Sequence, residues 1–62
     1  MNEYRDVFRG YDLERLKKYS LEQSYKNAQW LGRTFTKPPV IEREWEKDGM
    51  WFLVMTGEFD ER

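Results

Sequence analysis

"EREWEKDGMWFLVMTGEF", residues 42–59, contains two segments of strand character on either side of an Asp48-Gly49 pair. Aromatic and β-branched residues are frequent in residues 40–46 and 50–56, as they are in β-strands. An Asp-Gly pair adopts the backbone conformations that a tight turn between antiparallel strands requires. The stretch therefore predicts a β-hairpin, and this hairpin is the clearest element of the chain.

The two predicted strands differ in polarity. Side chains alternate across a strand, so Glu42, Glu44 and Glu46 are expected on one face of the first strand, opposite Ile41, Arg43 and Trp45. The second strand carries no charge from Met50 to Met55, and both of its faces are apolar. One helix covers one face of a small sheet, so the other apolar face needs a second cover or stays exposed as a binding patch.

The register of the hairpin decides which apolar residues lie beside Trp45. A two-residue Asp48-Gly49 turn pairs Trp45 with Phe52, whereas a three-residue turn with a glycine bulge pairs it with Trp51. We favour the bulge because "EKDG" suits a type I turn followed by a glycine with positive φ. The bulge predicts an exposed patch of Trp51, Leu53 and Met55, and the other register one of Phe52 and Val54.

A long amphipathic helix is predicted between Asp12, a suitable N-cap, and Leu31, with Gly32 placed to end it. Spacing at 100° per residue gathers an apolar and small-residue stripe on one side of this helix: Leu13, Leu16, Ser20, Ser24, Ala28 and Leu31. Small residues at its centre allow close packing on a sheet, and each serine hydroxyl can bond the carbonyl one turn back. Alternatively, "SLEQ" is a capping box, and the segment divides into two helices near Tyr19.

The segments on either side of this helix are less clear. Tyr4, Val7, Phe8 and Tyr11 have helical spacing and predict a short N-terminal helix, although residues 4–9 also fit an irregular strand. "RTFTKPP", residues 33–39, predicts a short edge strand that two prolines end. We therefore expect one α+β domain over residues 1–62, helical over 3–31 and a sheet over 33–59, with the helix or helices packed on a C-terminal antiparallel hairpin.

Composition argues against most catalytic and cofactor chemistry. The 62-residue chain has no Cys and no His, so the common zinc sites, disulfides, thiol nucleophiles and the commonest general base are excluded. The three strand glutamates are interpreted as solvated charges rather than a metal site, because hard cations need several convergent oxygen ligands. We expect no enzyme activity, no cofactor and no metal.

Function is predicted to be protein–protein interaction. The expected interface has Trp45, Trp51, Leu53 and Met55 as apolar anchors and Glu42, Glu44 and Glu46 as its polar rim. Its occupant is either a second copy of the chain, in a homodimer, or a larger protein, as for a small regulatory or accessory protein. The chain has no apolar run long enough to span a bilayer, so we expect a cytoplasmic protein that does not enter membranes.

Two other functions are compatible with the charge distribution. Residues 1–37 carry eight basic and five acidic side chains, a net charge of +3, whereas residues 38–62 carry three basic and seven acidic, a net charge of −4. A nucleic-acid-binding module would use the basic helix and its neighbour: Lys17, Lys18, Lys26 and Arg33. An inhibitor that mimics nucleic acid would use the acidic second half.

Overall fold

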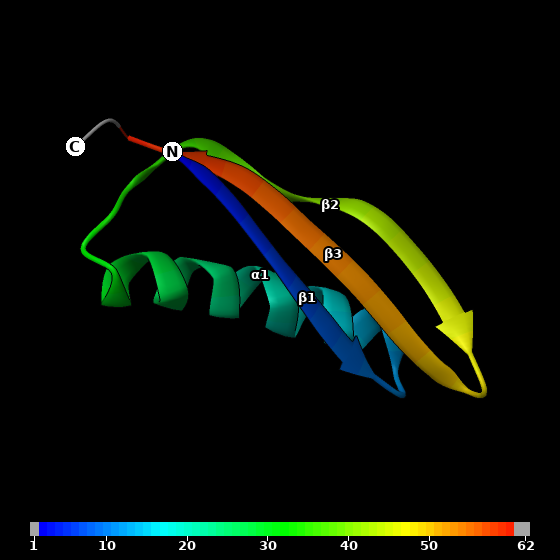
Figure 1. Cartoon of the computed structure of the whole chain (residues 1–62). Coiled ribbons are helices and arrows are strands. Elements are labelled where there is room, and N and C mark those ends of the chain that lie inside the picture. The colour runs from blue at the N-terminus through cyan, green and yellow to red at the C-terminus, as the bar shows by residue number, and fades with distance from the viewer. Residues whose placement is uncertain (1, 61–62) are drawn as a thin grey trace.

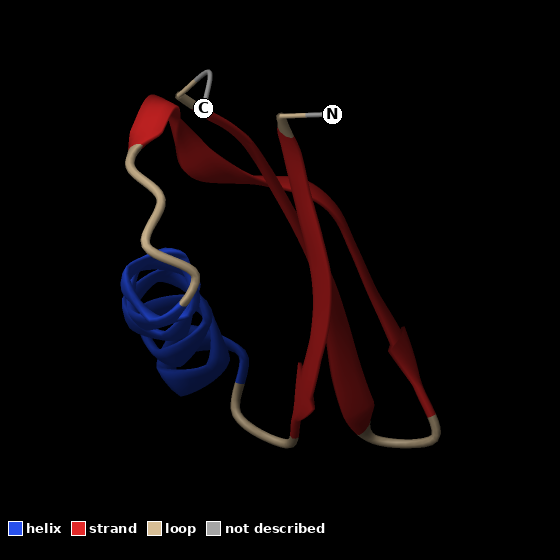
Figure 2. Ribbon diagram, turned by 60° about the vertical axis from the view of Figure 1, so that its left-hand side comes forward, coloured by secondary structure: helices blue, strands red, loops and turns tan. Residues whose placement is uncertain are grey.

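The computed structural model describes residues 2–60 and contains one helix and one three-stranded antiparallel sheet. In chain order the elements are β1 (Glu3–Gly10), α1 (Leu13–Trp30), β2 (Phe35–Lys47) and β3 (Met50–Phe59). The strand order β1-β3-β2 places β3 in the centre, with β1 and β2 as the two edges (Figure 1). α1 lies on one side of the sheet (Figure 2), so the expected α+β class is confirmed.

The N-terminal segment is a strand, and the prediction of a helix over residues 3–11 is wrong. Tyr4 and Phe8 are buried beneath α1, whereas the odd-numbered residues of β1 lie on the opposite face. A spacing of four residues suits both a helix and a strand, because four is also a multiple of the strand period of two. Pairing of β1 with β3 along its whole length decides in favour of the strand.

α1 has the predicted ends and is unbroken. The side chain of Asp12 accepts a hydrogen bond from the Arg15 backbone N–H at 3.2 Å, which caps the first turn. Leu31 is the C-cap, and Gly32 follows in the left-handed region with φ of 69°. Because the helix passes through Ser20 without interruption, the two-helix alternative is wrong.

The stripe of small residues packs against the sheet as predicted. Ser20 and Ser24 are fully buried, and their hydroxyls donate to the carbonyls of Leu16 and Ser20 at 2.6 and 2.7 Å. Ser24 Oγ also accepts from Tyr4 Oη at 3.1 Å, which ties the helix directly to β1. The core that forms between α1 and the sheet consists of Tyr4, Phe8, Leu16, Ala28, Leu53, Met55 and Phe59.

The turn between β2 and β3 is the two-residue form. Lys47 pairs with Met50, and Asp48 and Gly49 both have positive φ, 53° and 80°. This turn pairs Trp45 with Phe52, so the favoured register, with Trp51 opposite Trp45, is wrong. A turn with two residues of positive φ has a twist that matches the right-handed twist of the flanking strands. The twist of an ordinary type I turn does not match it and would splay the two strands apart.

Irregularities occur instead within β2, which is one strand of 13 residues. Its register shifts around Pro38 and Pro39 and again between Ile41 and Arg43. The short edge strand predicted at residues 33–39 therefore continues through the prolines into the hairpin. Proline is tolerated here because β2 is an edge strand and its register is interrupted at this point.

Overpacking of the helix–sheet contact tests this architecture. We expect Ser24→Leu to lower the free energy of unfolding by about 1–3 kcal/mol, because the larger side chain has no space against β1. Ser24→Ala should lower it by about 1 kcal/mol through loss of the hydrogen bond from Tyr4. Urea denaturation followed by circular dichroism measures both, and Glu22→Leu on the exposed side of α1 is the matched control. Equal stability of Ser24→Leu and Glu22→Leu would contradict the packing described.

Candidate interaction surface

Three of the four predicted anchors, Trp51, Leu53 and Met55, lie on the side of the sheet that α1 covers, and Trp45 lies on the other side. Leu53 and Met55 are 0% and 2% exposed, and Trp51 packs against the same core. This corrects the expectation of an exposed patch formed by these three residues. The two-residue turn, together with the placement of α1, brings this face of β3 into the core, so Leu53→Asp would disrupt the core rather than test an interface.

The uncovered side of the sheet, here called the open face, has an apolar centre. It is formed by the β3 residues that alternate with the core residues and by their neighbours on both edge strands: Val7, Val40, Trp45, Met50, Phe52 and Val54. Val54 is only 4% exposed because it lies between Val7 and Arg43 in the register of the sheet. Val7 and Val40 are more than half exposed. The open face is the face of the alternative patch of Phe52 and Val54, but Val54 is buried there and Phe52 is only partly exposed.

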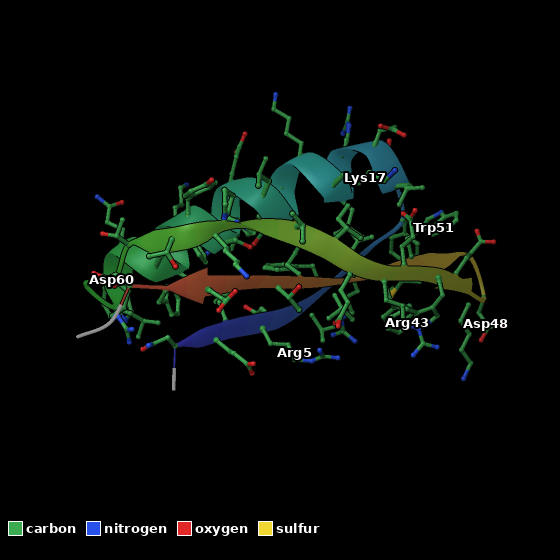
Figure 3. All side chains as sticks on the ribbon, turned by 90° about the horizontal axis from the view of Figure 1, so that it is seen from above. Arg5, Lys17, Arg43, Asp48, Trp51 and Asp60 are labelled. Atoms are coloured by element: carbon green, nitrogen blue, oxygen red, sulfur yellow. The ribbon has the colours of Figure 1, made fainter. Side chains whose placement is uncertain are left out.

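Two aromatic rings form a ridge on the open face near the hairpin turn. Trp45 and Phe52 stack with their ring centroids 5.3 Å apart and their planes inclined by 10°. The guanidinium of Arg43 lies over the Trp45 ring, 4.9 Å from its centroid. Figure 3 shows Arg43 on the side of the sheet away from Lys17 and α1. We call Trp45 and Phe52 the aromatic ridge.

The strand irregularity near Ile41 divides the three glutamates between the two faces. Glu42 lies on the open face, where its carboxylate is 2.7 Å from the Arg5 guanidinium. Glu44 lies on the helix side and pairs with Lys17 at 3.8 Å, and Glu46 is opposite Trp51 on that same side. Because two successive residues of a bulged strand occupy the space of one, the strict alternation expected for Glu42, Glu44 and Glu46 is wrong.

A shallow hollow of about 570 Å³ lies on the open face, at the end of the sheet away from the turn. Ion pairs cross it, from Arg5 to Glu42 at 2.7 Å and from Lys37 to Glu58 at 2.8 Å. We call the residues that line it on this face the acidic hollow: Glu3, Arg5, Lys37, Val40, Glu42 and Glu58.

The hydrogen bond to Glu58, reinforced by the negative charge of that carboxylate, raises the pKa of Lys37 above the ordinary value of a lysine. Folding raises this pKa, so the pair contributes to stability at neutral pH. The contribution is lost as the pH rises through the pKa of the folded lysine. Solvent screening of this exposed pair keeps its effect small.

Each edge of the sheet is obstructed at one place for further strands. On β1, Asp6 accepts the Val7 backbone N–H through Oδ1 at 2.9 Å and a hydrogen bond from Asn27 through Oδ2 at 3.2 Å. This charged side chain on an edge strand thus occupies a donor that a further strand would need. On β2, the prolines and the register shifts interrupt the edge. A partner that uses the sheet is therefore expected on its face.

The basic residues predicted to bind nucleic acid are dispersed. Lys17 pairs with Glu44 on β2, and Arg33 lies beyond the other end of α1, where it contacts Asp60 and the Phe59 ring. Lys18 and Lys26 are exposed on α1. The structure instead gathers Arg9, Arg43 and Lys47 around the aromatic ridge, from two strands that β3 separates.

Sequence reasoning missed the part that β1 plays in this surface. Alternation of Arg5, Val7 and Arg9 with Tyr4 and Phe8 was the signal, and it is typical of a half-buried strand.

Within residues 2–60, no group of three acidic, His or Cys side chains is placed to hold a metal ion. In the same described part of the chain, no helix has the length and hydropathy of a membrane span.

Comparisons with protein families, with curated proteins and with solved structures find no match to this chain.

The closure of the β1 edge by Asp6 has a direct test. We expect the Val7 amide to exchange with deuterium more slowly than the Arg5 amide on the same edge, because its N–H is bonded to Asp6. In Asp6→Ala the Val7 amide should exchange about as fast as that of Arg5, as followed by NMR. Asp12→Ala, which removes a carboxylate elsewhere, is the control. Unchanged protection of Val7 in Asp6→Ala would show that Asp6 does not cap this edge.

Proposed function

We propose that this protein is a non-enzymatic interaction protein of the regulatory or accessory kind, acting in the cytoplasm, and that its open face binds another protein chain. The observation that supports this most strongly is the contrast between the face and the edges of the sheet. The face has an apolar centre around Trp45 and Phe52 that α1 does not cover, whereas Asp6 and the prolines of β2 obstruct part of each edge.

The composition of the open face suits a protein interface. Aromatic rings and arginines are enriched at the centres of such interfaces, and here Arg43 covers Trp45 while Arg5 and Arg9 lie on the neighbouring strand. Trp45 and Phe52 are already partly buried, so covering the remainder of each ring would contribute a fraction of the roughly 1.5–3 kcal/mol that full burial of an exposed large side chain gives. Even that fraction counts beside the few kcal/mol of net stability that a domain of this size usually has.

The test is capture of a binding partner by a tagged chain from the cells that produce it, repeated with purified components. We expect Trp45→Ala and Phe52→Glu to weaken binding at least about tenfold, because they remove the centre of the surface. Trp30→Ala is the matched control, since Trp30 is 89% exposed on α1 and lies off the open face. Circular dichroism establishes that each variant is folded.

Binding that is equal in the wild type and in both open-face variants would contradict the proposal. A partner lost only in Trp30→Ala would move the interaction surface to the C-terminal end of α1.

A further inference from the structure

We infer that the occupant of the open face is a second copy of this chain, packed face to face with the strands running in reversed directions. In this arrangement the aromatic ridge of each copy lies against the acidic hollow of the other. The inference rests on the proposed function, because it assigns the partner of the same surface.

The open face has the shape of a self-complementary surface. The aromatic ridge, which includes Phe52, lies at the turn end of β3. The acidic hollow, which includes Glu58, lies at the other end of β3. Phe52 and Glu58 are six positions apart on β3, a distance of roughly 20 Å along an antiparallel strand. A two-fold axis that lies between the two sheets, above the middle of β3 and perpendicular to the strands, exchanges the two ends. Each ridge then meets a hollow, as an isologous dimer interface requires.

The charges of the two ends are complementary in the same arrangement. The ridge is flanked by Arg9, Arg43 and Lys47, and none of these forms an ion pair within residues 2–60. The acidic hollow has a net charge of −1, because its three carboxylates, those of Glu3, Glu42 and Glu58, outnumber its two cations. Glu42 and Glu58 are paired with Arg5 and Lys37, and Glu3 forms no ion pair within residues 2–60.

Stacking with reversed strands brings these cations to the carboxylates of the partner. Stacking with the strands in the same direction would instead place ridge against ridge and cation against cation, which is unfavourable. Charge complementarity therefore selects the reversed orientation.

The obstructed edges favour an assembly of two copies. Asp6 and the interrupted part of β2 hinder growth by strand addition, which leaves the face as the favoured part of the sheet for association. Each chain has one open face, and the dimer covers both. A three-stranded face is small, and interfaces that bury less than about 1,200 Å² in total are typically weak. We expect a dissociation constant on the order of 10 µM.

Sedimentation equilibrium of paired charge-reversal variants tests the inference. Variant A carries Arg9→Glu and Arg43→Glu at the ridge, and variant B carries Glu42→Lys and Glu58→Lys at the hollow. In either variant alone, like charges meet, so we expect association to weaken at least about tenfold relative to the wild type. An equimolar mixture should form the heterodimer about as tightly as the wild type associates, because both contacts are again between opposite charges.

Lys18→Glu on α1 should dimerise like the wild type. The inference is overturned if the wild type stays monomeric up to about 1 mM, if A or B associates as tightly as the wild type, or if the mixture does not form a dimer. It is also overturned if a monomeric wild type binds single-stranded oligothymidine and Trp45→Ala does not, since ring stacking and phosphate contacts would then be the use of the ridge.

Failure of the inference and failure of the proposed function give different results. If the chain is a monomer but a different protein is captured through Trp45 and Phe52, the open face is a binding surface and only the second copy is wrong. If Trp45→Ala and Phe52→Glu each dimerise as tightly as the wild type, association does not use the open face. The inference and the proposed function are then both wrong.

Discussion

The close contact between α1 and the sheet over Ser20, Ser24 and Ala28 is the constraint on which the other features depend. Small side chains let the helix backbone approach β1 and β3, and the serine hydroxyls are satisfied by carbonyls within the helix and by Tyr4. Helix and sheet then enclose the aromatic and aliphatic core. A single helix placed in this way covers one face of the sheet. The other face remains open because the described chain has no second layer.

The open face differs from an ordinary solvated face because the central strand is apolar on both sides. In many antiparallel sheets the outer face of each strand is polar, and water is its only partner. Here Phe52 and Val54 lie on the outer face of β3, and long arginine side chains from the edge strands surround them. Arginine stems cover apolar surface while their charged ends stay in water. The open face is therefore partly covered by these stems and retains some exposed apolar area.

The edges and the face of the sheet have opposite properties, and this contrast limits how the molecule can associate. An unpaired edge strand invites further strands, which leads to open-ended assembly. Asp6 occupies a backbone donor of β1, and the prolines and register shifts interrupt β2. The bulge near Ile41 also places Glu42 on the open face, away from Glu44 and Glu46. One irregularity thus helps to close an edge and supplies a carboxylate to the acidic hollow.

Local patterns in the sequence determined the elements whose signals lie within a few residues. The ends of α1, its buried stripe and the hairpin could be predicted because caps, helical periodicity and an Asp-Gly turn depend on neighbouring residues. The apolar character of both faces of β3 was also evident, and with it the expectation of an exposed patch.

Only the tertiary structure decided which apolar residues form that patch. The strand identity of residues 3–10 depends on pairing with β3, nearly fifty positions away, since Tyr4 and Phe8 fit a helix equally well. Hairpin register placed Phe52 rather than Trp51 beside Trp45. A one-residue change in register moves every side chain of a strand to the other face, so the face that α1 covers had to be known before the surface residues could be named.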